Sequence, residues 1–182
     1  MIINDLPLHG LKAIKLELRA DNRGFFTEIF NNQNFKEAGL PTEFAQDNHS
    51  RSAPGVIRGL HFQRLPKQDK ILGVIRGRIL DVVVDIRPDS PTFGKFHAQE
   101  LSDKNGTLLW IPSGFAHGFL VLGDEPADIL YKVTGFYNRD TEGGIRYDDG
   151  ELNIPWGVKN PMVSERDKAL PGWREYCDNP LV

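Results

Sequence analysis

The chain has 182 residues, 40% hydrophobic and 26% charged, and carries a formal net charge of −3 at pH 7. These values are typical of one globular domain with a substantial core, so we expect a single domain over residues 1–182. The 22 basic and 25 acidic residues form no basic cluster, which argues against nucleic acid as a partner.

Short apolar runs separated by glycine and proline predict an all-β protein. The 18 glycines and 12 prolines fall between those runs, at the spacing of a sandwich or barrel of short antiparallel strands. In chain order we expect a short helix over 34–39, strands over 71–75, 79–86, 108–111, 119–122 and 129–133, and a short helix over 164–169. Arg76-Gly77-Arg78 reads as a hairpin turn between the first two strands. The tail after Pro171 is expected to be irregular and packed over the body.

The second of these runs illustrates the pattern. If residues 79–86 form a strand, Val82, Val84 and Ile86 share one face, while Val83 and Asp85 lie on the other.

No segment indicates export, membrane insertion or disulfide formation. The first ten residues lack a basic segment followed by an apolar run, and the apolar stretches are too short to span a bilayer. Cys177 is the single cysteine, so an intrachain disulfide is impossible, and no Cys/His spacing indicates a zinc site. We therefore expect a cytoplasmic protein without a membrane partner.

Two histidines stand in spaced glycine and proline frames. Residues 55–63 read GVIRGLHFQ, and residues 106–117 read GTLLWIPSGFAH. They resemble the two cupin motifs, G-x5-H-x-H and G-x5-P-x-G-x2-H, whose three histidines and a glutamate hold a metal inside a jelly roll. Here Gln63 replaces the second histidine of the first motif, and no glutamate follows at the expected spacing. Two imidazoles and an amide make a poor transition-metal site, so we expect a pocket without metal or cofactor.

The cupin resemblance predicts a jelly-roll β-sandwich of antiparallel strands with a few short helices. It leaves His61 and His117 available for acid–base chemistry, because imidazole titrates near neutral pH. His9, His49 and His97 lie outside the motifs, and we interpret them as hydrogen-bonded surface or core residues.

Further motifs occur in a fixed order along most of the chain. They are DNRGFFTE at 21–28, QDN at 46–48, RGLHFQ at 58–63, Lys70, DVVVD at 81–85, GFAHGF at 114–119, Tyr131-Lys132 and SERD at 164–167. In this order and spacing they closely resemble the dTDP-4-dehydrorhamnose 3,5-epimerase family, metal-independent cupins of deoxysugar nucleotide biosynthesis. The resemblance implies an isomerase acting on a dTDP-linked 4-keto-6-deoxyhexose.

The resemblance also implies roles for individual residues in the reaction. The C4 ketone of such a substrate acidifies the hydrogens at C3 and C5, so epimerisation needs a base on one face and an acid on the other. The family pattern assigns the base to His61, with Asp167 orienting it, and the acid to Tyr131. It places the Lys70 ammonium against the C4 oxygen, where the negative charge of the enolate develops.

Other positions are implied to bind the substrate. They are Arg23, Glu28, Gln46, Asn48, Arg58, His117, Tyr137, Glu142 and Arg166. Arginine suits a pyrophosphate because of its planar set of donors, and Tyr137 is the candidate for stacking on the base. In the family, the stretch containing Arg23 and Glu28 reaches the neighbouring subunit's pocket, which implies a homodimer with shared pockets.

Several alternatives remain open. The chain could epimerise C3 alone or act on another nucleotide-linked 4-keto sugar, although keeping His61, Tyr131 and Asp167 favours both carbons. A metal-dependent cupin is disfavoured by Gln63, and a non-catalytic sugar-binding or structural cupin ranks last. Residues 123–128 and 170–182 match no family motif.

Overall fold

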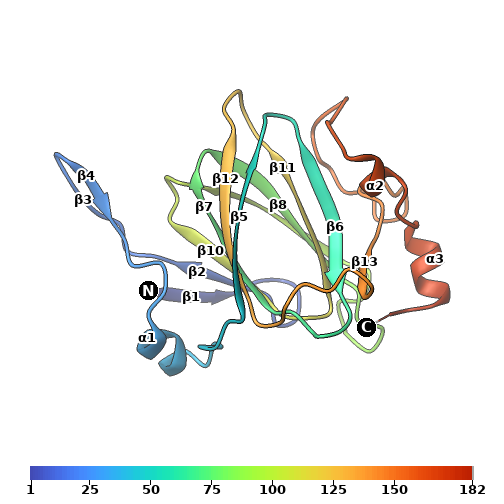
Figure 1. Ribbon diagram of the computed structural model, residues 1–182, viewed down its shortest axis with the longest axis horizontal. Coiled ribbons are helices and arrows are strands. Elements are labelled where there is room, and N and C mark those ends of the chain that lie inside the picture. Colours follow the sequence, from blue (N-terminus) through green and yellow to red (C-terminus); the bar gives the residue numbers. More distant parts are fainter. Residues whose placement is uncertain (182) are drawn as a thin grey trace.

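Two antiparallel β-sheets packed face to face form the body of the molecule (Figure 1). The computed structural model describes residues 1–181. The six-stranded sheet contains, in spatial order, β1 (Ile2–Asp5), β2 (Lys12–Lys15), β10 (Thr107–Ile111), β7 (Lys70–Arg76), β12 (Ala127–Val133) and β5 (Gln46–Ser52). The five-stranded sheet contains β13 (Glu142–Gly144), β6 (Ile57–Gln63), β11 (Phe115–Val121), β8 (Arg78–Asp85) and β9 (Phe96–Ser102). This is a jelly-roll β-sandwich, and the predicted fold class is confirmed.

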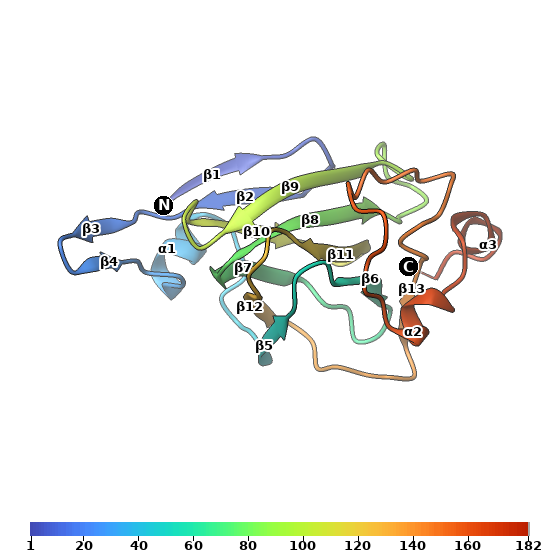
Figure 2. The same cartoon turned by 90° about the horizontal axis from the view of Figure 1, so that it is seen from above.

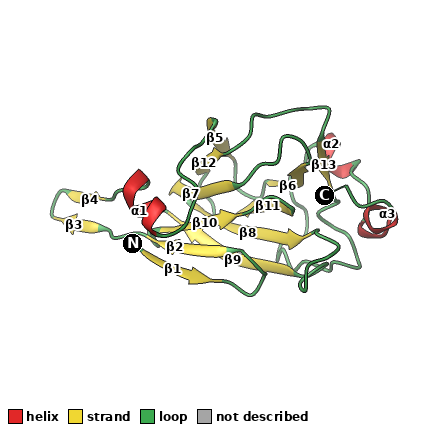
Figure 3. Ribbon diagram, turned by 90° about the horizontal axis from the view of Figure 1, so that it is seen from below, coloured by secondary structure: helices red, strands yellow, loops and turns green. Residues whose placement is uncertain are grey.

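Smaller elements lie at the two ends of the sandwich. A two-stranded hairpin, β3 (Arg19–Asp21) and β4 (Gly24–Phe26), projects away from the body, as Figure 2 shows. The helices are α1 (Asn32–Glu37) near that hairpin, and α2 (Glu165–Lys168) and α3 (Trp173–Asp178) at the opposite end (Figure 3). None of the helices in residues 1–181 has the length and apolar character needed to cross a membrane.

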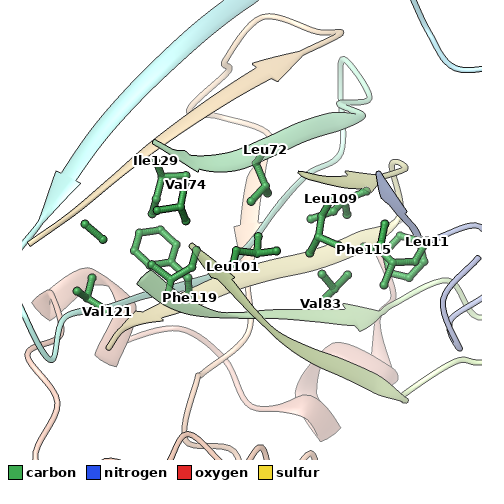
Figure 4. Packing of buried hydrophobic residues seen from close by; sticks show 14 of the residues in the cluster. Leu11, Leu72, Val74, Val83, Leu101, Leu109, Phe115, Phe119, Val121 and Ile129 are labelled. Carbon is green, nitrogen blue, oxygen red and sulfur yellow. The ribbon is translucent and has the colours of Figure 1, made fainter. Parts of the chain in front are cut away.

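The apolar core fills the space between the sheets (Figure 4). Leu72, Val74 and Ile129 from the six-stranded sheet pack against Val83 and Phe119 from the five-stranded sheet. Strand β8 is buried on both faces, with Ile79 and Val83 in the core between the sheets. Val82, Val84 and Ile86 face away from this core and pack with the C-terminal segment. That is why this strand reads as a nearly continuous apolar run.

All five predicted strands are confirmed, with ends shifted by at most four residues. The predicted hairpin turn over 76–78 is wrong, because β7 and β8 do not pair: this turn carries the chain from the six-stranded sheet to the five-stranded sheet. Both predicted helices are present. The first begins at Asn32 because the side chain of Asn31 accepts hydrogen bonds from the backbone N–H groups of residues 33 and 34. Its chain reversal uses Gly39 at φ +68°. The second is capped by the Ser164 side chain, which accepts from the Asp167 N–H.

The prediction that the tail after Pro171 is irregular is wrong. Residues 173–178 form α3, which has no side-chain N-cap. Trp173 and Tyr176 are buried against the outer face of the five-stranded sheet, and the Tyr176 hydroxyl donates to the Ile86 carbonyl at 2.7 Å. A helix this short has little stability of its own, so tertiary burial stabilises it and the local sequence gives no periodic signal. The predicted packing of the tail over the body is confirmed.

Candidate active site

A cavity of about 400 Å³ opens between the two sheets, where the apolar core ends. Its size falls within the usual range for small-molecule sites. The five-stranded sheet contributes Arg58, His61, His117, Gly118, Phe119 and Glu142, while the six-stranded sheet contributes Gln46, Asn48, Ser50, Lys70, Leu72, Ile129, Tyr131 and Val133. Gln68 and Tyr137 line it from loops.

The cavity therefore contains nine of the predicted site residues, and both sheets are needed to build it.

Strand alternation explains the polar wall. On β5, Gln46, Asn48 and Ser50 are spaced two residues apart, so all three project toward the cavity. The neighbouring strand β12 presents Ile129, Tyr131 and Val133 with the same spacing. Sequence analysis missed Ser50, although the two-residue spacing after Gln46 and Asn48 would have identified it.

His61 and His117 lie directly opposite each other on the adjacent strands β6 and β11. The two strands come unusually close beside them, because a Cβ on Gly59 would lie 2.6 Å from the Gly118 Cα. Gly59 also has φ +117°, a conformation that other residues rarely adopt. Glycine at this position therefore allows the two histidines to share one wall of the cavity.

The Asp167 carboxylate holds His61. His61 Nε2 hydrogen-bonds to Asp167 Oδ1 at 2.8 Å, and the Gly59 backbone N–H donates to Oδ2 at 3.2 Å. Burial raises the pKa of the Asp167 carboxyl, but the hydrogen bond and charge of His61 outweigh it and keep the pKa below its usual value. An ionised Asp167 accepts the Nε2–H of a neutral His61, which leaves Nδ1 with a free lone pair.

A second His–Asp pair stands beside the first. His117 Nε2 hydrogen-bonds to Oδ2 of the fully buried Asp81 at 2.7 Å. Asp81 Oδ1 has no hydrogen-bond partner among residues 1–181. Sequence analysis did not select Asp81, although it begins the DVVVD motif and belongs to the strand next to His117.

Lys70 is a partly buried cation in the cavity lining. Burial lowers its pKa, while the nearby charges of Glu142 and Asp81 oppose that shift. Lysine in such surroundings is suited to stabilising a developing anion, because little water competes with it.

Tyr131 lies on the wall opposite His61, since it belongs to the six-stranded sheet and His61 to the five-stranded sheet. Burial raises the pKa of the Tyr131 hydroxyl, which therefore stays protonated at neutral pH. The Arg58 charge opposes this shift, and the Arg58 guanidinium is itself held by a 2.9 Å hydrogen bond from Nε to the Ser52 hydroxyl. An imidazole and a protonated phenol thus line one cavity from opposite sheets.

Polar residues at the cavity mouth form a connected group. The Tyr137 hydroxyl donates to Glu142 Oε2 at 3.0 Å, and Arg166 also donates to Glu142. The hydrogen bond to Glu142 raises the pKa of Arg166. Gln46 accepts from the Tyr137 backbone N–H and donates to Asn48 Oδ1 at 2.6 Å.

Two predicted site residues lie elsewhere. Arg23 is at the tip of the projecting hairpin, where its guanidinium pairs with Asp21 at 2.6 Å. Glu28 follows the hairpin, and its carboxylate accepts hydrogen bonds from Asn31 and Asn34 at the start of α1. Neither residue lines the cavity of its own chain.

The three remaining histidines have ordinary surroundings. His49 Nε2 hydrogen-bonds to the Asp128 carboxylate at 2.9 Å, and His97 Nε2 to the Gln99 side-chain oxygen at 3.2 Å. His9 uses its backbone N–H to bond the Thr92 hydroxyl. No three His, Cys, Asp or Glu side chains within residues 1–181 are grouped so that they could hold a metal ion.

Comparisons with known sequences agree on one family. Its sequence profile, described as dTDP-4-dehydrorhamnose 3,5-epimerase, matches residues 5–175. A dTDP-4-dehydrorhamnose 3,5-epimerase from Shigella flexneri is 52% identical over 81% of this chain and 82% of its own, and one from Methanothermobacter thermautotrophicus is 44% identical over 96% and 94%. A dTDP-4-dehydrorhamnose 3-epimerase from Streptomyces niveus is 39% identical over 92% and 82%.

Solved structures are similar over nearly the whole chain. An epimerase from the novobiocin biosynthetic gene cluster of Streptomyces spheroides, which acts on 4-keto-6-deoxy sugars, has a TM-score of 0.95, with 37% identity over 100% of this chain and 92% of its own. A 3,5-epimerase from Legionella pneumophila, in complex with dTDP-4-keto-L-rhamnose, has a TM-score of 0.89, with 42% identity over 94% and 92%. A 3'-monoepimerase from Streptomyces bikiniensis, with a histidine and a tyrosine replaced and dTDP bound, has a TM-score of 0.92, with 29% identity over 98% and 90%.

Proposed function

The chain belongs to the dTDP-4-dehydrorhamnose 3,5-epimerase family, and from this premise we propose the reaction that its pocket performs. The enzyme epimerises C3 and C5 of dTDP-4-dehydro-6-deoxy-D-glucose and forms dTDP-4-dehydro-L-rhamnose. The observation that supports this most directly is the placement of the His61–Asp167 pair and Tyr131 on opposite walls of one cavity, which Lys70 also lines.

Proton transfer proceeds through an enolate. His61 Nδ1 takes the proton from C3, the electrons of the broken C–H bond move into the C4 carbonyl, and the Lys70 ammonium stabilises the oxygen anion. The Tyr131 hydroxyl then delivers a proton to C3 from the opposite face, which inverts the carbon. Solvent removes the proton from His61 and returns one to Tyr131, and the same steps invert C5.

The nucleotide occupies the mouth of the cavity in this proposal. Arg58 and Arg166 supply planar guanidinium donors for the diphosphate, and the Tyr137 ring stacks on the base. Gln46, Asn48, Glu142 and His117 provide the polar contacts to the sugar and nucleoside.

Proton NMR in D₂O tests this function. The unaltered enzyme, incubated with dTDP-4-dehydro-6-deoxy-D-glucose and no added metal, should incorporate deuterium at both C3 and C5. Its His61→Ala variant should incorporate none. Exchange at both carbons by the folded His61→Ala variant contradicts the proposed base.

The second candidate function is epimerisation of C3 alone, or of another nucleotide-linked 4-keto sugar. The similarity to the 3-epimerase from Streptomyces niveus favours it. Deuterium at C3 without deuterium at C5 identifies this activity in the same experiment.

We further propose a homodimer whose pockets are completed by the partner's hairpin. Phe25 and Phe26 are 57% and 66% exposed on a hairpin that extends away from the sandwich (Figure 2), and Arg23 lies in the turn of that hairpin. Aromatic side chains exposed in this way favour association with another chain. A second copy that places Arg23 and Glu28 at the open pocket would bury them.

Mixing two inactive variants tests the shared pocket. Arg23→Ala and His61→Ala are each expected to be inactive as homodimers. When the two variants are mixed in equal amounts and re-equilibrated, half of the dimers are hybrids, and one of the two pockets in each hybrid is intact. About a quarter of the unaltered activity should therefore return. No recovery, despite exchange of subunits, contradicts the shared pocket.

We also propose that residues 1–182 act as one domain in the cytoplasm. The pocket takes residues from both sheets, which share one core, and this supports a single functional unit. The proposed substrate is a charged nucleotide sugar that does not cross membranes unaided, which supports the location.

A further inference from the structure

We propose that Gln63 is a positioning residue that sets the orientation of Tyr137 and thereby the affinity for the nucleotide. The inference rests on the proposed function, in which the Tyr137 ring contacts the base. Gln63 stands where the first cupin motif has its second histidine, and the proposed reaction gives it no part.

The Gln63 amide is fully engaged with the backbone of two loops. Gln63 is 6% exposed at the end of β6. Its Nε2 donates to the carbonyl oxygens of Pro66 and Phe136, both at 2.8 Å, and its Oε1 accepts from the Asn138 backbone N–H at 2.9 Å. One side chain thus joins the loop after β6 to the loop after β12.

Two of these bonds fall on either side of Tyr137. The Phe136 carbonyl lies in the same rigid peptide plane as the Tyr137 nitrogen, and the Asn138 N–H lies in the same plane as the Tyr137 carbonyl. Fixing both planes fixes φ and ψ of Tyr137 and so the direction of its Cα–Cβ bond. Gln46 reinforces the first plane, because its Oε1 accepts from the Tyr137 N–H at 3.3 Å.

Tyr137 needs this support because little packing holds its ring. The residue is 52% exposed, and the hydrogen bond from its hydroxyl to Glu142 fixes only the far end of the side chain. Without the Gln63 amide, the segment would have to be ordered when the nucleotide binds, which weakens binding. The reacting groups are held separately, His61 by Asp167 and Tyr131 within β12, so the chemical step does not depend on Gln63.

Gln63→Met tests the inference, since methionine has a similar length and volume without polar atoms. Calorimetric titration with dTDP should give a Kd about tenfold higher, which corresponds to about 1.4 kcal/mol. KM for the sugar nucleotide should rise by a similar factor, while kcat at saturation changes by less than about twofold.

A double-mutant cycle separates positioning from general destabilisation. Tyr137→Ala should weaken dTDP binding, and adding Gln63→Met to it should raise Kd by less than about twofold, because an effect that acts through Tyr137 disappears with it. Thr92→Val is the matched control. It removes a hydrogen bond to the buried Asp85 outside the pocket, and it should lower the thermal midpoint without changing Kd.

If Gln63→Met does not fold, Gln63→Glu provides the same test, because it keeps the acceptor for Asn138 and removes both donors. An unchanged Kd, an equal loss in the Tyr137→Ala background, or a lower kcat at unchanged Kd overturns the inference. Failure of the unaltered chain to bind dTDP is a different result, since it contradicts the proposed function itself.

Discussion

Replacing Asp167 by asparagine is expected to inactivate the enzyme by reversing the tautomer of His61. Asp167 accepts two hydrogen bonds, from His61 Nε2 and from the Gly59 N–H. An asparagine has only one oxygen. If that oxygen accepts from Gly59, the amide N–H₂ must donate to His61 Nε2, which moves the imidazole proton to Nδ1 and removes the lone pair that is proposed to take the substrate proton.

The size of the loss follows from the role of the base. Positioned general acid–base catalysis contributes about 10²–10⁴-fold, and Asp→Asn changes that impose the wrong histidine tautomer in hydrolase triads cost about 10⁴-fold. We therefore expect kcat to fall by about 10³–10⁴-fold, an increase of about 4–5.5 kcal/mol in the barrier. The opposite orientation of the amide would place its N–H₂ donors against the Gly59 N–H donor, so that orientation does not restore the original His61 tautomer at low cost.

Deuterium exchange at C3 and C5, followed by NMR at saturating substrate, measures this loss directly. Asp148→Asn is the control, because it removes the same charge from an exposed pair with Arg146. The control should retain full exchange, and both variants should bind dTDP. Exchange within about tenfold of the unaltered rate in folded Asp167→Asn would refute the tautomer argument.

Three further predictions concern single side chains. Tyr131→Phe should keep deuterium exchange measurable but slow epimerisation by about 10²–10⁴-fold, because removal of the substrate proton does not need the acid. An equal loss of both rates, measured by NMR, would argue against Tyr131 as the acid. Burial lowers the pKa of Lys70 and raises that of Tyr131, so kcat should fall as pH rises through the Lys70 pKa. Lys70→Arg should move this alkaline limb of the pH–rate profile to higher pH. If the limb does not move, Lys70 is not the group that titrates. Hydrogen bonds from Arg51 lower the pKa of Asp128 to about 2 despite burial. This carboxylate therefore stabilises the fold above the unfolded pKa of about 3.9, and that stabilisation is lost as pH falls toward 2. In thermal melts, the melting temperature of Asp128→Asn should therefore fall less than that of the unaltered protein between these two pH values.

The fold was predictable where burial leaves a repeating pattern in the sequence. Residues 79–86 are buried on both faces because one face lies in the inter-sheet core and the other under the C-terminal segment. The projecting hairpin gave no such signal, since all residues of β3 and β4 are exposed. Helix α3 was missed for a related reason, because Trp173 and Tyr176 are buried by a sheet that is distant in sequence.

The site was predictable only where motifs specify residue types. His61 and His117 could be selected from their glycine and proline frames, and the structure places them opposite each other on neighbouring strands. The family pattern also paired Asp167 with His61, and the two side chains are hydrogen-bonded, but it gave no partner for His117. The bond from Asp81 to His117 depends on the pairing of β8 with β11, and the engagement of Gln63 with two loops depends on where those loops meet.

The number of carbons that such a pocket inverts is not decided by its acid and base. A 3'-monoepimerase of the same fold has been studied with a histidine and a tyrosine replaced, so a His/Tyr pair does not by itself imply inversion at both carbons. His61 and Tyr131 belong to different sheets, so the sugar must turn to bring C5 to them after C3. Leu72, Phe119 and Val133 form apolar parts of the cavity wall, against which a turning sugar would move. The ratio of deuterium at C5 to deuterium at C3 therefore measures the shape of the wall rather than the strength of the base.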